Sequence, residues 1–467
     1  RNIPALVFSL NGDFIDDSFI YSLNQIESFF CFIFVEQHRY TRLFSPKFIF
    51  ILIHSTMQKT PTIKRLIHFS ILILLSNACF LYSPKPTIDT EFWGEYVPLN
   101  PYAGFILNYD SNEYIESAMS PSVLLRENYV RQSRPLYSVV ASCVGYTVHY
   151  ISSPFKNLFE LTLKKSMYVG YVFLNFTILL LSLYFFDKIV RILTDGNISY
   201  TTTLMLSVFI ASNFMTKAFF WTAHQQMFAF LIPLFCIYIS IKWLKVMSTK
   251  NIYLYFFMLG LGMLMYGSFL ILFVSALLYL CYILYDDKKL MSNHTFGFLF
   301  ISCILFLLPT LLWILFLKYK GIEYYNHEIV RYRQLVWIID SLSVSPTNFA
   351  TALCLNLVEF ISTLTMMYIF MAFVGVTIIF RKIKAQPAFI FDRNTKLILL
   401  QLGCFTVFFM LLGYYAERLT FTIMPILLCL SIAQAGSLLN AKKAQIAIFI
   451  TVCVWHTYNV FSYGPFS

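Results

Sequence analysis

Charged residues are scarce in this chain, since Asp, Glu, Lys and Arg together make up only 12% of its 467 residues. Soluble domains carry about 25% charged residues, so this scarcity argues against a soluble domain. Hydrophobic residues make up 58% of the sequence, and apolar runs long enough to cross a bilayer recur along it. The runs are continuously apolar, whereas barrel strands alternate. We therefore predict an all-α polytopic membrane protein.

Several chemical signatures are also missing. The ten cysteines form no CxxC pair, and most lie inside apolar runs, where a thiol behaves as a small hydrophobic side chain. No set of His, Cys, Asp and Glu shows metal-ligand spacing, and neither a P-loop nor a GxGxxG motif opens a helix. These absences argue against a disulfide framework, a metal site and ATP-driven transport by this chain alone. The net charge of +11 comes from basic loops that set topology, and it does not indicate nucleic-acid binding.

The apolar runs predict about ten to twelve membrane spans. We expect residues 1–56 to be an extension upstream of the native start, because the first Met is Met57 and the apolar stretches before it are too short to span. Basic residues and then an apolar run follow Met57, which favours a signal anchor. The predicted spans are 66–83, 135–152, 167–186, 200–220, 226–246, 252–285, 296–317, 349–380, 396–415, 419–438 and 444–462.

Two features of these spans leave the topology open. The run 252–285 is too long for one untilted helix, and a break near Tyr266 would make it two short ones. Basic loops stay in the cytoplasm, and this rule places the loops 84–134 and 318–348 outside. Between 135 and 285, however, the positions of the basic residues require one membrane crossing more or fewer than the number of apolar runs gives. The residues that mark the cytoplasmic side are Lys59, Lys64, Arg65, Lys242, Lys245, Lys250, Lys288, Lys289, Arg381, Lys382, Lys384, Arg393, Lys396, Lys442 and Lys443.

The stretch 109–137 is polar, carries both signs of charge and lies between two apolar runs. A helix over 110–119 would place Asp110, Glu113 and Tyr114 on one face, because residues three and four apart are neighbours. A carboxylate at the lipid–water boundary is partly desolvated, which raises its pKa toward the range of a general base. The alternative is a solvated loop helix with ordinary acidic residues. The helix would also carry an apolar stripe suited to the membrane surface, formed by Ile115, Ala118 and Met119.

A pattern of known type begins with Asp110, Glu113, Tyr114 and Ala118 and ends with Arg134-Pro135-Leu136-Tyr137 at the start of a span. It resembles the first outer loop of the GT-C superfamily of polyprenyl-phosphate-sugar-dependent glycosyltransferases. The resemblance is closest to bacterial members akin to protein mannosyltransferases and aminoarabinose lipid A transferases. In those families an acidic residue of this loop, usually Asp, acts as the base, and the loop ends in an Arg-Pro-Pro-x-Tyr-type sequence. Leu136 departs from that sequence, but the departure changes no charged group.

The resemblance implies a GT-C-type helical bundle over residues 57–467, with juxtamembrane helices on its outer face. Loop 84–134 would be the first outer catalytic loop, and 318–348 would match a later outer loop of the superfamily. The turn at 414–419 before Pro425 resembles the Glu-Arg-Tyr-x-x-Pro-type step of these enzymes. Each of these likenesses places polar residues on one membrane face.

The implied function is transfer of a sugar from a polyprenyl-phosphate donor to a lipid, glycan or protein acceptor, with inversion of the anomeric centre. The implied place is a bacterial inner membrane, with the site facing the periplasm. Asp110 would be the base, and cations would stabilise the departing phosphate, which arginine binds with a bidentate fork. The resemblance does not decide whether a divalent cation takes part, because some members use one and others do not. The candidate substrate-binding residues are Glu113, Tyr114, Arg131, Arg134, His327, Arg331, Arg333, Glu417 and Arg418.

Other interpretations of single residues stay open. Arg331 and Arg333 have aromatic neighbours that are typical of interfacial anchoring. A polar patch at a helix end is favoured over sugar contact for His224-Gln225-Gln226. Glu359 lies inside the predicted span 349–380, where it pairs with Asn356 or lines a cavity.

Two other functions compete with sugar transfer. A flippase or transporter for a lipid-linked glycan would use an outer arginine-rich loop, but it predicts inverted repeats, and no repeat is visible in the sequence. An O-antigen-type polymerase is also a multi-span protein with arginines in outer loops. Its large functional loops usually come later in the chain, whereas the strongest motif here follows the first span.

Overall fold

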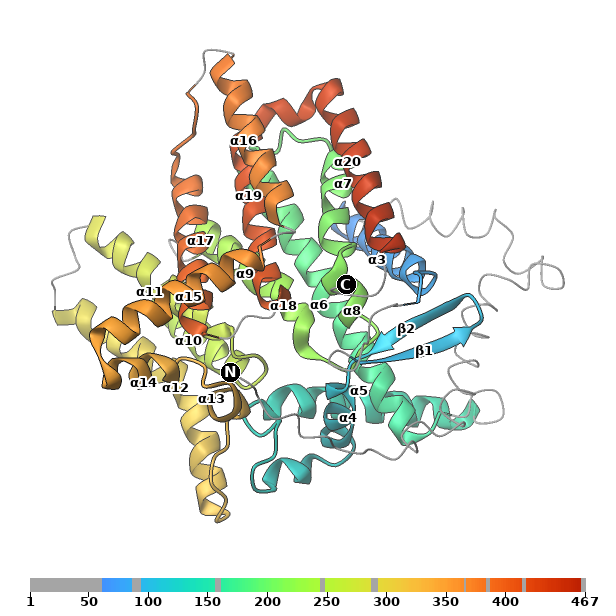
Figure 1. The fold of residues 1–467 in the computed structure, drawn as a ribbon, viewed down its shortest axis with the longest axis vertical. Coiled ribbons are helices and arrows are strands. Elements are labelled where there is room, and N and C mark those ends of the chain that lie inside the picture. Colours follow the sequence, from blue (N-terminus) through green and yellow to red (C-terminus); the bar gives the residue numbers. More distant parts are fainter. Residues whose placement is uncertain are drawn as a thin grey trace.

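The computed structural model describes residues 61–85, 94–155, 161–243, 248–286, 293–364, 367–383, 387–413 and 417–462. The predicted extension 1–56 lies outside these described residues. Within them the chain is helical apart from one β-hairpin (Figure 1). Six helices are long and apolar enough to cross a membrane: Thr62–Leu81, Leu163–Leu193, Gln225–Lys242, Phe296–Tyr319, Arg393–Leu412 and Lys442–Phe461. The prediction of an essentially all-α polytopic membrane protein is therefore confirmed, and shorter apolar helices lie among the long ones.

Most helices run between two ends of the molecule. We call one the pocket end, where residues 224–226, 263–268 and 412 line a shared cavity. The other is the basic end, where the side chain of Arg393 donates to the hydroxyl of Tyr279 at 2.6 Å. The helices between the ends are α3 (Pro61–Leu81), α6 (Leu163–Leu193), α7 (Tyr200–Ala211) with α8 (Phe214–Phe219), α9 (Phe228–Tyr238), α10 (Thr249–Met263), α11 (Phe269–Asp286), α12 (Asn293–Tyr319), α16 (Tyr368–Ile383), α17 (Arg393–Leu412), α19 (Met424–Ala435) and α20 (Lys442–Phe461).

Direct contacts place several basic residues of the sequence together at the basic end. Arg65, in the first turns of α3, forms an ion pair with Asp187 near the end of α6 and lies 4.7 Å from the ring centroid of Tyr200 at the start of α7. Asn440, just before the lysines that open α20, accepts a hydrogen bond from the backbone of Ser199. The starts of α3, α7 and α20 and the end of α6 therefore meet at the end of the helices away from the pocket.

Helix α5 (Pro135–Ser152) resolves the conflict in the number of crossings. It starts at the pocket end, where the hydroxyl of Tyr137 donates to the main-chain oxygen of His224 at 3.1 Å. It ends beside the start of α6, because His149 contacts Ser166 at 3.4 Å. Gly145 has no room for a side chain against Met167, so the two helices pack closely. Thus α5 pairs with the first half of α6 and does not reach the basic end, and the prediction of 135–152 as a separate crossing is wrong.

Two other long runs are broken at the pocket end. The run 252–285 forms two helices, α10 and α11, with a break over 264–268 that includes Tyr266. Of the two alternatives, one long tilted helix or two short ones, the second is therefore correct. The run 349–380 does not form one span. It divides into α15 (Pro346–Ser362) and α16, and the main-chain oxygen of Thr363 accepts from the hydroxyl of Thr420 at the pocket end.

Helix α15 therefore stays at the pocket end together with α13 (His327–Tyr332) and α14 (Val336–Val344). Glu359 is exposed on α15 and does not line the pocket, contrary to the prediction of a deep position in a span. The hydropathy pattern predicts a deep position for Glu359 because residues on both sides of the turn at 363–364 are apolar, so the end of the helix at this turn is not visible in the sequence.

The hairpin of β1 (Glu95–Asn100) and β2 (Ala103–Leu107) is not predicted by the apolar pattern. Its strands are antiparallel, with Glu95 opposite Leu107 and Tyr96 opposite Ile106. The main-chain oxygen of Ile106 accepts from the hydroxyl of Thr222, just after α8. The hairpin therefore fixes the first outer loop to the end of α8, directly before the polar stretch that follows.

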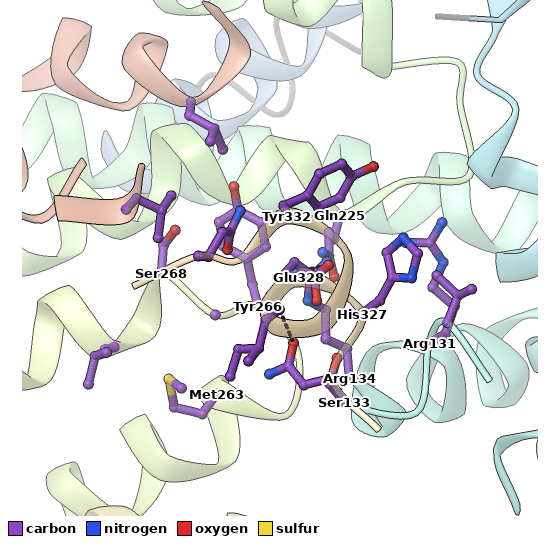
Figure 2. Close-up of a pocket in the computed structure, with 18 of the residues that line it drawn as sticks. Arg131, Ser133, Arg134, Gln225, Met263, Tyr266, Ser268, His327, Glu328 and Tyr332 are labelled. Atoms are coloured by element: carbon purple, nitrogen blue, oxygen red, sulfur yellow. Dashed lines mark hydrogen bonds and ion pairs between the residues drawn. The ribbon is translucent and has the colours of Figure 1, made fainter. Parts of the chain in front are cut away.

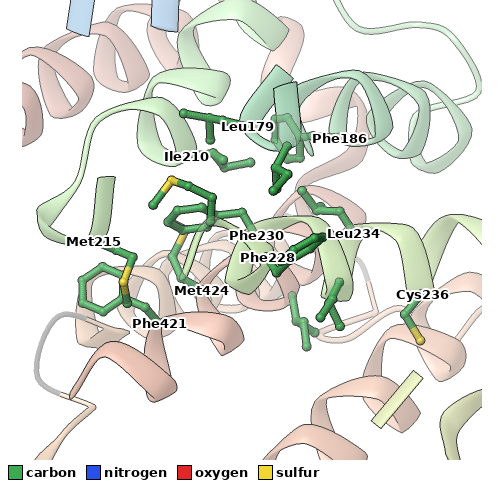
Figure 3. Close-up of a cluster of buried hydrophobic side chains, with 14 of the residues drawn as sticks. Leu179, Phe186, Ile210, Met215, Phe228, Phe230, Leu234, Cys236, Phe421 and Met424 are labelled. Carbon is green, nitrogen blue, oxygen red and sulfur yellow. The ribbon is translucent and has the colours of Figure 1, made fainter. Parts of the chain in front are cut away.

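The core is centred on α9 (Figure 3). In the span that contains α9, 78% of the residues are buried, compared with 17% for α12. Phe230 and Leu234 of α9 are fully buried, and they lie among side chains from α6, α7, α8 and α19. Because α9 is enclosed by other helices, the residues that precede it, 224–226, are held in place at the pocket end.

The path of α5 predicts which residues share a side of the membrane. In a variant without native cysteines, Tyr150→Cys at the end of α5 and Tyr319→Cys at the end of α12 should react with a membrane-impermeant maleimide from the same side. Ala441→Cys, before α20, should react only after permeabilisation. All three positions are exposed. Labelling of Tyr150→Cys together with Ala441→Cys would show that α5 crosses the membrane.

Candidate functional site

A cavity of about 350 Å³ lies at the pocket end. It is lined by the first outer loop, by the chain breaks before α9 and α11, and by α13 with its flanking residues. The predicted site residues that line it are Asp110, Glu113, Arg131, Arg134 and His327. Residues far apart in the sequence therefore meet around one space, as the sequence analysis expects.

Helix α4 (Asp110–Met119) forms as predicted and carries both carboxylates in its first turn. The helix starts where it does because the side-chain oxygen of Asn108 accepts from the backbone N–H of Asp110 at 3.0 Å. One nitrogen of Arg131, Nη2, lies 2.9 Å from Oδ1 of Asp110 and 2.8 Å from Oε2 of Glu113. The guanidinium of Arg131 also lies over the ring of Tyr114, 4.3 Å from its centroid.

These neighbours keep the Arg131 side chain protonated. Its side chain is 5% exposed, and such burial alone lowers the pKa of a guanidinium. Tyr114, Asp110 and Glu113 outweigh the burial and raise the pKa of Arg131 above its usual value. Burial likewise raises the pKa of the Tyr114 hydroxyl, so this tyrosine stays neutral beneath the cation.

The apolar stripe of α4 does not rest on a membrane surface. Ile115 is 2% exposed and Ala118 is fully buried, because α5 and α6 cover that side of the helix. The hydroxyls of Ser117 and Ser138 join α4 to α5 at 2.8 Å. The prediction of a surface-lying helix is therefore wrong for these residues, since α5 folds back against α4 and does not cross to the basic end.

Arg134 forms a second ion pair in the pocket. Its Nη2 lies 2.6 Å from Oε1 of Glu328, and both side chains are 17% exposed. The side-chain amide of Gln225 lies between Arg134, the hydroxyl of Tyr114 and the main-chain oxygen of Met265. Burial opposes the charge of Arg134, but Glu328 and Tyr114 raise its pKa above the usual value.

Helix α13 lies over the pocket and presents Glu328, His327 and Tyr332 toward it (Figure 2). It is tied to the first outer loop through Gln132, whose side-chain oxygen accepts from the backbone N–H of Tyr325 at 2.6 Å. Burial lowers the pKa of His327, and the nearby Arg131 lowers it further against the opposing effect of Glu328. A lowered pKa means that His327 is neutral at and above its ordinary pKa of 6.5.

Arg331 and Arg333 do not line the pocket, although the sequence places them among the candidate substrate-binding residues. Both are exposed. Arg333 ends α13 with a left-handed φ of +54°, and its side chain pairs with Asp340 at the surface at 2.5 Å. This placement agrees with interfacial anchoring, the other interpretation of the two arginines.

Tyr414–Ala416 and the side chains of Glu417 and Arg418 lie outside the described part of the structure. The backbone of α18 (Glu417–Thr420) is described, and Leu419 in it lines the pocket. Helix α18 therefore comes to the pocket end.

His224 lines the pocket as well, although the sequence favours a polar patch at a helix end. Its Nε2 lies 3.4 Å from Oδ2 of Asp110, and its side chain is 5% exposed. The only signal for it in the sequence is a polar interruption between two apolar runs, and such interruptions are common at span ends. Among the described residues, no three His, Cys, Asp or Glu side chains are grouped so that they could hold a metal ion.

Comparison with known proteins adds no relative. No protein-family model matches this chain, and no curated protein matches it. The family resemblance therefore rests on the first-loop pattern and on the weaker likenesses in the later loop and turn.

The two carboxylates should depend on Arg131 for their place in the fold. Arg131→Met leaves Asp110 and Glu113 without their shared cation, and we expect it to destabilise the protein by roughly 1–3 kcal/mol, since their partial exposure reduces the cost of breaking a buried pair. Arg126→Met is the control, because the Arg126–Glu116 pair is exposed and such pairs contribute about 0–1 kcal/mol. Unfolding of both variants in detergent would measure the difference, and equal losses would contradict the structural role of Arg131.

Proposed function

We propose that this chain is a membrane glycosyltransferase of GT-C type, which transfers a sugar from a polyprenyl-phosphate donor to a hydroxyl of a lipid, glycan or protein acceptor, with inversion. The observation that carries the proposal is that one pocket holds both a partly exposed carboxylate, that of Asp110, and the largely buried guanidinium of Arg134. These are the two kinds of group that the reaction needs.

The chemistry assigns a role to each group. The acceptor oxygen forms a bond to the anomeric carbon as the bond from that carbon to the lipid phosphate oxygen breaks. Asp110 takes the proton of the acceptor hydroxyl, which is general base catalysis. The leaving phosphate gains negative charge, and an arginine in a water-poor site stabilises it more strongly than water does. Arg134 suits this role better than Arg131, whose Nη2 is already shared by Asp110 and Glu113.

The rest of the pocket suits a donor that is partly lipid. Met263 of α10 and Phe408, Phe409 and Leu412 of α17 line it together with the charged residues. A cavity lined by both charged and apolar side chains fits a phosphate headgroup that carries a hydrocarbon tail. The helices that supply these apolar side chains run to the basic end, so the pocket lies at one membrane face.

The distribution of charge supports the orientation. Arg65, Arg191 and Arg393 and the lysines that open α20 lie at the basic end, and by the positive-inside rule that end would be cytoplasmic. The pocket would then face the periplasm of a bacterial inner membrane, where a lipid-linked donor presents its sugar to outer acceptors.

Removal of the base should abolish transfer without loss of the protein. In Asp110→Asn the side chain keeps its size but accepts no proton, so we expect the transfer rate to fall by about 10²–10⁴-fold. The rate would be measured with purified protein and radiolabelled polyprenyl-phosphate sugars. Glu116→Gln is the matched control, because Glu116 lies on the same helix, pairs with Arg126 at the surface and does not line the pocket. Full activity of Asp110→Asn would show that another group is the base.

Release of Arg134 should strengthen donor binding. Glu328→Gln keeps the shape of the side chain but removes the charge that competes with the donor phosphate for Arg134, so we expect the donor KM to fall several-fold. Asp340→Asn is the control, because Asp340 pairs with Arg333 away from the pocket. A raised donor KM in Glu328→Gln would mean that Glu328 binds the donor and does not compete with it.

A further inference from the structure

We propose that His224 is a positioning residue that sets the orientation of the Asp110 carboxylate; the proposal rests on the proposed transferase activity. His224 precedes α9, about a hundred residues from Asp110 in the sequence, and neither the first-loop pattern nor its likeness to a family includes it. The structure brings Nε2 of His224 to 3.4 Å from Oδ2 of Asp110.

The hydrogen-bond partners of His224 fix its tautomer. Its Nδ1 accepts from the backbone N–H of Gln226 at 3.1 Å, so that nitrogen carries no hydrogen in the neutral ring. The hydrogen then resides on Nε2, the nitrogen that faces Asp110. In this tautomer the N–H of His224 faces the carboxylate oxygen at 3.4 Å and can donate toward it.

The ring of His224 is held from several directions. Tyr114 packs edge-on against it with ring centroids 5.5 Å apart, and Phe219 lies 4.9 Å away on α8. The hydroxyl of Tyr137 donates to the main-chain oxygen of His224 at 3.1 Å. These contacts come from α4 of the first outer loop and from α5 and α8, so the position of Nε2 does not depend on the outer loop alone.

The contact with His224 adds a restraint on the Asp110 carboxylate to the one that Arg131 supplies. It is the first residue of α4, and its side chain is 37% exposed. Arg131 contacts Oδ1 of Asp110 and also contacts Glu113. Its contact with Glu113 can therefore persist while the carboxylate of Asp110 rotates. A donor on Oδ2 from a separate element restricts rotation of the carboxylate. A base must lie within hydrogen-bond reach of the proton it takes, so small rotations change the rate.

Two substitutions separate the contact with Asp110 from the contact that supports the fold. In His224→Asn the amide reaches the place of Nδ1 and can still pair with the backbone of Gln226, but it does not reach Asp110. In His224→Gln the amide N–H reaches the place of Nε2 and can donate to Asp110. We expect His224→Asn to lower kcat by about tenfold or more, with the donor KM unchanged, and His224→Gln to retain most of the rate.

The comparison decides between positioning and plain structural support. A structural role predicts that His224→Gln, which loses the backbone contact, is at least as impaired as His224→Asn. That outcome would overturn the proposal, as would a His224→Asn variant whose kcat equals that of the unchanged protein. A rise in the donor KM with kcat unchanged would also overturn it, because His224 would then bind the donor.

A second measurement needs no enzymatic activity. Thermal unfolding midpoints in detergent of Asp110→Ala, His224→Asn and the double variant form a cycle that reports the coupling between the two side chains. We expect the double variant to shift the midpoint by less than the sum of the single shifts. Additive shifts would overturn the contact itself. If the unchanged protein transferred no sugar from any polyprenyl-phosphate donor, the proposed function would fail, whereas the cycle would still decide whether His224 and Asp110 interact.

Discussion

The pocket end depends on one buried cation. Arg131 lies almost entirely out of solvent, and a guanidinium in that position is stable only beside negative groups and acceptors. Asp110 and Glu113 supply the charge, and the ring of Tyr114 supplies a cation–π contact. To satisfy Arg131, the first turn of α4 must lie against the loop that precedes α5. That single requirement fixes the carboxylates, and Arg134, three residues later, lines the same pocket.

The rest of the pocket is built from irregular backbone, which a membrane protein tolerates only at certain places. Unpaired backbone groups are tolerated at membrane depth only where they are buried in protein or line a cavity. In this chain the breaks at 220–227, 264–268 and 321–326 all come to the pocket end, and each supplies polar groups to it. The long apolar helices carry few polar residues of their own. The interruptions between them therefore hold most of the groups that can act on a substrate, and the enclosed α9 keeps one of these interruptions rigid.

Part of this arrangement could be predicted from the sequence. The spacing of Asp110, Glu113 and Tyr114 is compatible with a helix, and α4 forms there. Arg134 and His327 are candidates for one site through the family resemblance, and both line the pocket. The path of α5 could not be predicted, because hydropathy measures the length of an apolar run and not its direction. The break after Ser362 was hidden for the same reason, since apolar residues continue on both sides of it. The contact of His224 with Asp110 depends on how α4, α5 and α8 pack, and no local pattern encodes it.

The balance of charge in the pocket gives α13 a part in ligand binding. Among the described residues that line the pocket, three carboxylates, those of Asp110, Glu113 and Glu328, face the two guanidinium groups of Arg131 and Arg134. The pocket therefore carries excess negative charge before any anion binds, and His327 adds no positive charge while it is neutral. A phosphate can enter such a site at low cost only if one carboxylate leaves. Asp110 and Glu113 are tied to Arg131 within one loop, whereas Glu328 belongs to the separate helix α13. An anionic ligand would therefore displace Glu328 from Arg134, which couples occupancy of the pocket to the position of the helix above it.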